Sequence, residues 1–165
     1  MKIKDIRENR IAPFECKDEK LILLFSFFLH NAPTIDSATA MNIESERLQN
    51  NWNEYLETAQ LQNYKFLSSN CKIEKYLLDT HLDDEAEVNR RSKSFVCKLK
   101  DKKETEYECI LRHLRNSIAH SHVYLVHAGN RKYIMFEDFN TSGKQSSLIL
   151  LSQSDLKNLK NEITR

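Results

Sequence analysis

The sequence predicts a mainly α fold, in which a helical bundle is followed by a C-terminal β-hairpin or meander and a short terminal helix. Three observations support this prediction. The chain has only two glycines and two prolines, so it lacks the many turn residues of a β-sandwich or barrel. Apolar residues recur with helical spacing over most of the first 120 residues, and strand-like alternation begins only after that. With 165 residues, the chain is expected to form one domain over residues 1–165.

The first part of the chain is predicted to consist of helices. A first helix is expected over residues 18–31, ended by Pro33. Its apolar run is far shorter than the roughly 20 residues that span a bilayer, so we expect a soluble protein with no membrane contact. A long helix is expected over 44–67 and a third over 71–82, whereas 86–99 fits a helix or an ordered loop. The inner face of the long helix is predicted to carry Leu48, Trp52, Leu56, Ala59 and Tyr64.

The last third is predicted to change from helix to strands and back. A helix over residues 104–121 is followed by two strands, 123–127 and 133–139. These flank a turn containing Gly129 and are predicted to form a β-hairpin. A third strand is expected over 147–151. The final helix begins near Ser152, whose spacing to Asp155 suits a capping box. This helix is expected to bury Leu156, Leu159 and Ile163.

The sequence LRNSIAH, at the end of the 104–121 helix, indicates chemistry. Arg115 offers a permanent cation with a planar fork of donors suited to phosphate, and His120 can exchange a proton near neutral pH. Such a pair suits cleavage of a phosphodiester. The motif, together with the order of a late helix, strands and a short helix, resembles the HEPN superfamily of small helical RNases and RNA-binding domains. In that family four to six residues separate an arginine from a histidine at the end of a late helix, and a polar residue often follows the arginine, as Asn116 does here.

The resemblance implies a metal-independent endoribonuclease that acts as a homodimer, with Arg115, Asn116 and His120 as catalytic residues and no cofactor. His120 would take the proton of a ribose 2′-hydroxyl, and a histidine, from either protomer, would protonate the leaving 5′ oxygen. Arg115 would bind the phosphate, and Asn116 would orient the phosphate or the imidazole. A toxin or phage-defence role, with an antitoxin or inhibitor protein as a further partner, belongs to the same expectation. The alternative is a non-catalytic RNA-binding or protein-interaction HEPN module.

A helical wheel predicts how these side chains lie. Arg115 and His120 are about 140° apart on a regular helix, so they converge only if the helix unwinds or a second protomer contributes. The wheel places His113, Asn116 and His120 in one stripe that points away from the core. His122 also satisfies the family spacing and is a runner-up catalytic residue. His113 is the other runner-up.

Charge and cysteine content complete the expectations. The stretch 90–103 carries +6, whereas the rest of the chain carries −5, and it is either a solvated surface or an RNA-guiding patch. Its cations are Arg90, Arg91, Lys93, Lys98, Lys100, Lys102 and Lys103. The four cysteines show no metal-ligand spacing, so we predict reduced thiols in the cytoplasm and no metal site.

Overall fold

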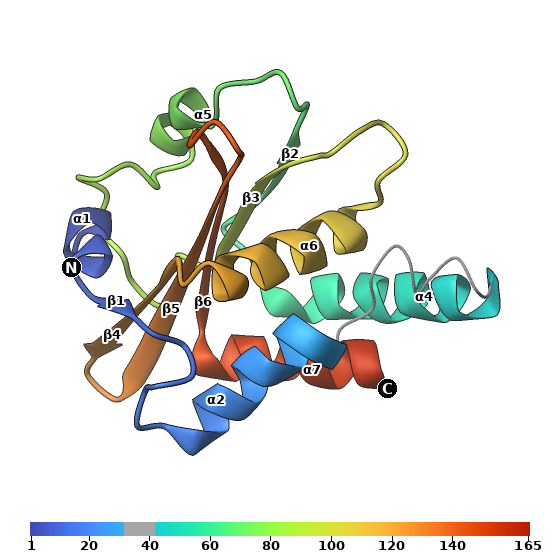
Figure 1. Ribbon diagram of the computed structural model, residues 1–165, viewed down its shortest axis with the longest axis horizontal. Coiled ribbons are helices and arrows are strands. Elements are labelled where there is room, and N and C mark those ends of the chain that lie inside the picture. Colours follow the sequence, from blue (N-terminus) through green and yellow to red (C-terminus); the bar gives the residue numbers. More distant parts are fainter. Residues whose placement is uncertain (32–41) are drawn as a thin grey trace.

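The computed structural model describes residues 1–31 and 42–165, which form a mixed α/β structure around one six-stranded sheet (Figure 1). The strands are β1 (Arg10–Ile11), β2 (Asn63–Leu67), β3 (Ser94–Lys98), β4 (Val123–Ala128), β5 (Arg131–Phe139) and β6 (Gln145–Ser152). The helical elements are α1 (Ile3–Arg7), α2 (Glu19–Ser26), the π-helical η1 (Phe27–Asn31), α4 (Asn42–Ala59), α5 (Ile73–Asp79), α6 (Glu106–Ala119) and α7 (Gln153–Thr164). The predicted mainly helical bundle is therefore wrong, because the sheet is the centre of the fold.

The sheet joins strands from both ends of the chain. Its order is β1-β4-β5-β6-β3-β2, and all neighbours are antiparallel except β2 and β3. The predicted hairpin and third strand are confirmed as β4, β5 and β6. The strands β2 and β3 were not predicted. They occupy the region assigned to the end of the long helix and to the 86–99 segment, where β3 pairs with β6 and β2 covers β3.

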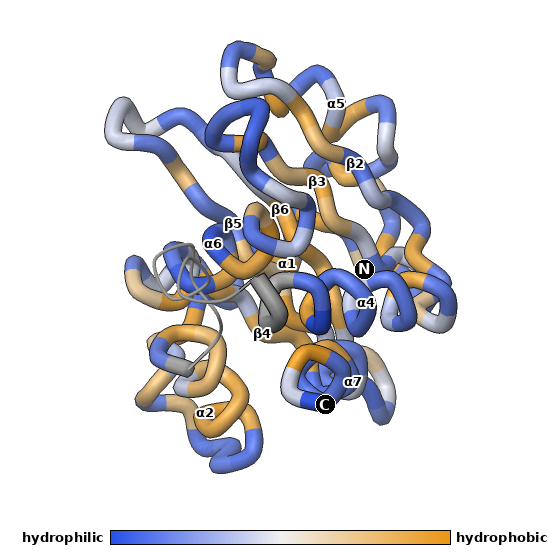
Figure 2. The backbone as a smooth tube through the Cα atoms, turned by 90° about the vertical axis from the view of Figure 1, so that its right-hand side faces the viewer, coloured by the Kyte–Doolittle hydropathy of each residue, from blue (hydrophilic) through white to orange (hydrophobic). Residues whose placement is uncertain are grey.

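Helices cover both faces of this sheet. One apolar core lies between the sheet and α2, η1, α4, α6 and α7, and a second lies between the sheet and α1 and α5 (Figure 1). Successive residues of a strand enter opposite cores: Phe95 packs into the first and Val96 into the second. Because both faces are buried, these strands read as continuous apolar runs without alternation. Figure 2 shows this hydrophobic character along β3 and β6.

The helices α4, α5 and α6 end without a glycine after their last turn. Gln60, His81 and Ser121 adopt positive φ angles of 51°, 59° and 57°, directly after α4, α5 and α6 or their cap residues. After α5, the Leu82 N–H donates to the Leu77 carbonyl at 2.8 Å, the hydrogen bond of a Schellman motif. Glycine is the usual signal for this conformation, so its absence hid the end of α4 at Ala59.

The termini of the other helices agree with the predictions. The Asp18 side chain caps α2, which continues into η1, while Pro33 lies outside the described residues. Ser152 and Asp155 form the predicted capping box of α7, and this helix buries Leu156, Leu159 and Ile163. Trp52, predicted on the inner face of the long helix, is buried, and so are Phe25 and Phe28. Tyr64 lies on β2 instead of a helix, and its hydroxyl accepts a hydrogen bond from Trp52 Nε1 at 2.8 Å.

No helix within residues 1–31 and 42–165 combines the length and the apolar character needed to cross a bilayer.

Candidate functional site

Helix α6 carries the predicted motif and is held firmly at its start. Thr105 and Glu108 form a capping box there, with Glu108 N–H donating to Thr105 Oγ1 at 3.4 Å and Thr105 N–H donating to Glu108 Oε2 at 3.0 Å. The helix lies on β3 and β5 and contacts η1 on another side. Side chains on most of its surface are therefore buried, including Leu114 and Ile118.

Helix α6 ends at the motif histidine, His120, which is its C-cap residue. Ser121 N–H donates to the Ile118 carbonyl at 3.2 Å and His122 N–H to the Ser117 carbonyl at 2.8 Å, which is the Schellman pattern. The Arg10 guanidinium donates to the carbonyls of Ser121 at 2.7 Å and His120 at 3.3 Å. His120 is thus a cap residue with a fixed backbone and an exposed side chain.

A buried polar group lies one to two turns earlier in the helix. His113 is fully buried, and its Nδ1 lies 2.8 Å from Asp138 Oδ2 on β5. Its Nε2 lies 2.8 Å from the carbonyl oxygen of Lys98, at the end of β3. The Asn116 amide donates to the same carboxylate oxygen of Asp138 at 3.2 Å. Each ring nitrogen faces an acceptor at 2.8 Å, and the Arg112 Nη2 donor lies farther from Nε2, at 3.3 Å, so His113 fits as an imidazolium that donates from both nitrogens.

The pKa values of this group agree with a buried ion pair. Burial lowers the pKa of His113, but the hydrogen bonds to Asp138 and Cys109 together outweigh burial and raise the pKa to about 9. Burial raises the pKa of Asp138, but the hydrogen bond and charge of His113, with the Asn116 amide, bring it below its ordinary value. The pair is therefore charged at neutral pH and holds Asn116 in place.

A second buried ion pair lies beside the first. Two guanidinium nitrogens of Arg112 donate to the Glu104 carboxylate, Nε to Oε2 at 2.7 Å and Nη2 to Oε1 at 3.0 Å. Arg112 Nη2 also donates to the Lys98 carbonyl at 3.1 Å. Burial raises the pKa of Glu104, but the hydrogen bonds from Arg112 and the Lys100 N–H, with the charge of Arg112, together offset this, so the pKa lies below its ordinary value. The Arg112 guanidinium is therefore bound to acceptors of the segment that precedes α6.

Sequence reasoning missed Asp138, although a signal for it exists. Glu137 and Asp138 are adjacent carboxylates in an apolar strand, and both are buried. Because neighbours on a strand face opposite sides, Glu137 binds Arg7 of α1 and Asp138 binds His113 of α6. Carboxylates in such a strand are rarely buried without a partner, so their positions predict cations on the covering helices.

A cavity of about 720 Å³ opens over this group. It is lined by His113, Asn116 and His120 of α6, by Asp138 and Phe139 of β5, and by Lys98 and Lys100 at the end of β3. In the part of the chain that the structure describes, neither lysine amine has a hydrogen bond or ion pair. The cavity therefore combines a titratable imidazole, an amide and two available cations.

The structure separates the other motif residues from this cavity. Arg115 is half-buried and does not line it, and no hydrogen bond or ion pair of its guanidinium is found within residues 1–31 and 42–165. The ring centroid of His122 lies 6.4 Å from that of His120 and 4.8 Å from Phe139, outside the cavity lining. Burial, Arg10 and His120 lower the pKa of His122.

The helical wheel was wrong about His113. It placed this residue on an outward stripe, whereas the side chain is fully buried against the sheet. A helical wheel that considers only apolar residues shows one buried face of α6. The helix has a second buried face, where polar side chains bind Asp138 and the Lys98 carbonyl.

The predicted basic stretch is divided between both ends of β3. Arg90 and Arg91 are exposed before the strand, and Lys93 pairs with Asp155 at 3.0 Å. Lys98 and Lys100 line the cavity at the other end, followed by exposed Lys102 and Lys103. The five-residue strand between these ends spans roughly 16 Å, so the cations do not form one patch.

Among residues 1–31 and 42–165, no group of three or more His, Cys, Asp or Glu side chains could bind a metal ion.

The chain is similar to a known protein family. The sequence model of the family described as HEPN pEK499 p136 matches residues 22–165. No curated protein and no solved structure matches the chain. The match covers the motif helix, the cavity and all strands except β1.

Proposed function

Because this chain belongs to the HEPN pEK499 p136 family, as the motif predicted at superfamily level, we propose that it is a metal-independent endoribonuclease. Its active site is shared between two copies of the chain. The observation that carries the proposal is the cavity at the end of α6, where His120 and Asn116 lie with two available lysines over a buried ion pair.

The side chains of this cavity suit cleavage of RNA by its own 2′-hydroxyl. His120 removes the 2′-hydroxyl proton, and the oxygen attacks the adjacent phosphorus. The bond from phosphorus to the 5′ oxygen breaks, and a second histidine, from either copy, supplies the proton to that oxygen. The products are a 2′,3′-cyclic phosphate and a 5′-hydroxyl. Lys98 and Lys100 bind the phosphates of the flanking nucleotides.

Arg115 acts from the second copy in this proposal. Within one copy it lies outside the cavity, and its guanidinium has no acceptor among residues 1–31 and 42–165. In a symmetric dimer that packs the ends of the two α6 helices together, the Arg115 guanidinium gains an acceptor. This acceptor is the phosphate bound beside the His120 of the other copy. There it stabilises the charge that develops on the phosphate oxygens.

His113 and Asp138 are positioning residues in this mechanism. Both ring nitrogens of His113 are bound to internal acceptors, so the imidazole has no nitrogen free for substrate. Asp138 holds the Asn116 amide, whose remaining N–H and oxygen are left for phosphate or imidazole. An unrestrained nuclease of this kind arrests growth when overexpressed, and an antitoxin or other inhibitor protein is its expected partner.

Cleavage of a labelled RNA in EDTA tests the proposal. We expect the wild type to cut the RNA and to leave cyclic phosphate ends, and the His120→Ala and Arg115→Ala variants to be slower by roughly 10²- to 10⁴-fold. The control is His127→Ala, which changes an exposed histidine outside the cavity. A substrate with a 2′-deoxyribose at the cleavage position should remain intact. Binding without cleavage by all proteins would instead identify a non-catalytic RNA-binding module.

A further inference from the structure

The N-terminal strand β1 reaches the end of the motif helix. It pairs antiparallel with β4, and Arg10 lies opposite Tyr124 (Figure 1). Helix α6 ends at Ala119 and β4 begins at Val123, so only a short connection, residues 120–122, joins them. The pairing therefore places Arg10 beside the connection that carries both motif histidines.

The Arg10 guanidinium binds this connection at two points. Its Nε donates to the Ser121 carbonyl at 2.7 Å, and its Nη2 donates to the His120 carbonyl at 3.3 Å. These carbonyls follow the last turn of α6, where the backbone has no partner within the helix and the helix dipole favours a cation. Arg10 forms no ion pair within residues 1–31 and 42–165, whereas Arg7 and Arg112 bind carboxylates. Its bonds in this region are thus to the backbone of the motif.

The backbone that Arg10 holds is strained. Ser121 has a φ angle of 57°, which residues other than glycine adopt at a cost. Such a conformation persists only where the surrounding structure fixes it. The two hydrogen bonds from Arg10 supply part of that restraint.

The position of this backbone decides where two imidazoles lie. His120 lines the cavity of about 720 Å³, and its ring centroid lies 6.4 Å from that of His122. Only Ser121 separates them along the chain, so a change in its φ and ψ angles moves one ring relative to the other. A misplacement of about 1 Å can cost on the order of 10²-fold in rate. Arg10 can therefore control the site without contacting RNA.

We propose that Arg10 is a positioning residue of the nuclease site, whose guanidinium fixes the connection between α6 and β4 so that His120 faces the cavity. This inference rests on the proposed function. The family match begins at residue 22, so Arg10 lies outside it.

Steady-state cleavage of a labelled RNA in EDTA tests the inference. In Arg10→Ala we expect kcat to fall by about tenfold or more and KM to stay within about twofold of the wild type, because a positioning residue does not bind substrate. Arg10→Lys should recover most of the lost kcat, since an ammonium group can also donate to carbonyls at a helix C-terminus.

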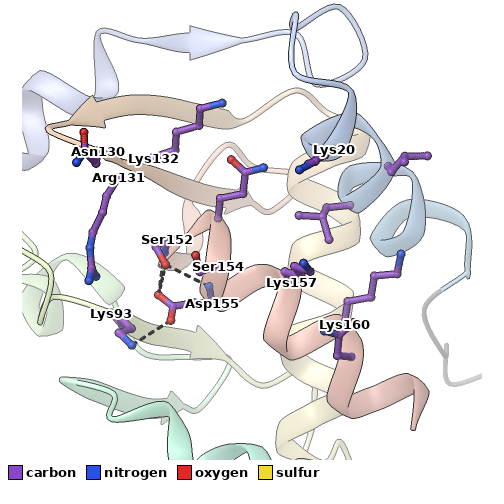
Figure 3. A pocket seen from close by; sticks show the side chains of 14 residues that line it. Lys20, Lys93, Asn130, Arg131, Lys132, Ser152, Ser154, Asp155, Lys157 and Lys160 are labelled. Atoms are coloured by element: carbon purple, nitrogen blue, oxygen red, sulfur yellow. Dashed lines mark hydrogen bonds and ion pairs between the residues drawn. The ribbon is translucent and has the colours of Figure 1, made fainter.

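Two arginine variants serve as matched controls. Arg47→Ala removes an exposed arginine whose Nη1 donates to the backbone oxygen of Arg165, the C-cap residue of α7, at 2.6 Å. Arg131→Ala removes an exposed cation at the start of β5, from a cavity of about 810 Å³ between α2 and α7 (Figure 3). The first control reproduces the loss of a bond at a helix end, and the second reproduces the loss of a positive charge. Both variants should cleave RNA as the wild type does, and thermal melting establishes that all of the variants are folded.

A second measurement follows the connection without RNA. Burial lowers the pKa of His122, and the charges of Arg10 and His120 add to this effect, whereas those of Glu137 and Asp138 oppose it. Titration of the His122 ring protons by NMR should therefore give a higher pKa in Arg10→Ala than in the wild type. Arg10→Lys should give a value closer to that of the wild type, and Arg47→Ala should leave it unchanged.

The results that would overturn the inference differ from those that would overturn the nuclease itself. A wild type that cleaves RNA, with an equally active Arg10→Ala or with equal losses in Arg10→Ala and Arg47→Ala, would show that Arg10 does not position the site. A rise in KM at constant kcat would show that Arg10 binds RNA instead. An unchanged pKa of His122 in Arg10→Ala would show that the guanidinium does not face the connection. A wild type without cleavage would overturn the proposed function, and the positioning role with it.

Discussion

The Asp138→Asn variant is expected to unfold with a free energy about 3–5 kcal/mol below that of the wild type at pH 6, because it leaves the buried His113 imidazolium without its counter-ion. The substitution preserves shape, so the loss measures the charge interaction and not a cavity. The same carboxylate holds Asn116, so RNA cleavage should fall as well. Urea denaturation followed by circular dichroism gives the free energy of unfolding.

The pH dependence of this effect follows from the raised pKa of His113. Its ordinary value is 6.5 and its folded-state value is about 9, so the stabilisation is fully present below pH 6.5 and is lost as pH rises through 9. At roughly 1.4 kcal/mol per pKa unit, the wild type should lose on the order of 3 kcal/mol over this interval. The lowered pKa values of Asp138 and His122 act in the opposite direction, and their stabilisation is lost as pH falls.

The difference between wild type and Asp138→Asn should therefore be largest at pH 6 and small at pH 9. Glu85→Gln is the control, because this exposed carboxylate pairs with Lys2 and Lys4 and stays ionised throughout the interval. Its variant should keep the wild-type slope. A wild type that is equally stable at pH 6 and pH 9 would contradict the assignment of His113 as a buried imidazolium.

The Leu114→Asp variant is expected not to fold, whereas His120→Ala should melt close to the wild type. Leu114 is fully buried in the core between α6 and the sheet, where an unpaired carboxylate costs more than a domain of this size can lose. His120 is exposed at the end of the same helix, and its backbone is held by Arg10. Thermal melting by circular dichroism measures both.

Leu114→Met separates burial of charge from loss of shape. This substitution keeps the volume apolar and should cost less than about 1.5 kcal/mol. Equal losses of thermal stability in Leu114→Asp and His120→Ala would show that the two residues do not differ in burial.

The sequence predicted the elements whose signals are local. The hairpin has its glycine turn, α7 has its capping box, and α6 has a strong apolar stripe. Strands β2 and β3 lack such signals, because their partners are distant in the sequence and both faces of β3 are buried. Helix α4 ends at a non-glycine residue with positive φ, so the helical pattern could be extended too far.

The candidate site shows the same division. The motif predicted that His120 and Asn116 belong to one site, and the two residues line the same cavity, while their catalytic role stays a prediction. What the motif lacks is the partner from β5, since Asp138 follows Asn116 by 22 residues and reaches it only through the sheet. The spacing of the motif residues also does not show that Arg115 lies outside the cavity. That placement depends on how α6 packs between the sheet and η1.

Restoration of activity by mixing two inactive variants tests the central claim most directly. The Arg115→Ala and His120→Ala chains are co-expressed with different tags, purified through both, and assayed for RNA cleavage in EDTA. A dimer of one copy of each retains one intact site, with Arg115 from one chain and His120 from the other. It should therefore cleave at about half the wild-type rate. Mixed dimers as inactive as either variant alone would show that Arg115 and His120 do not act across two copies.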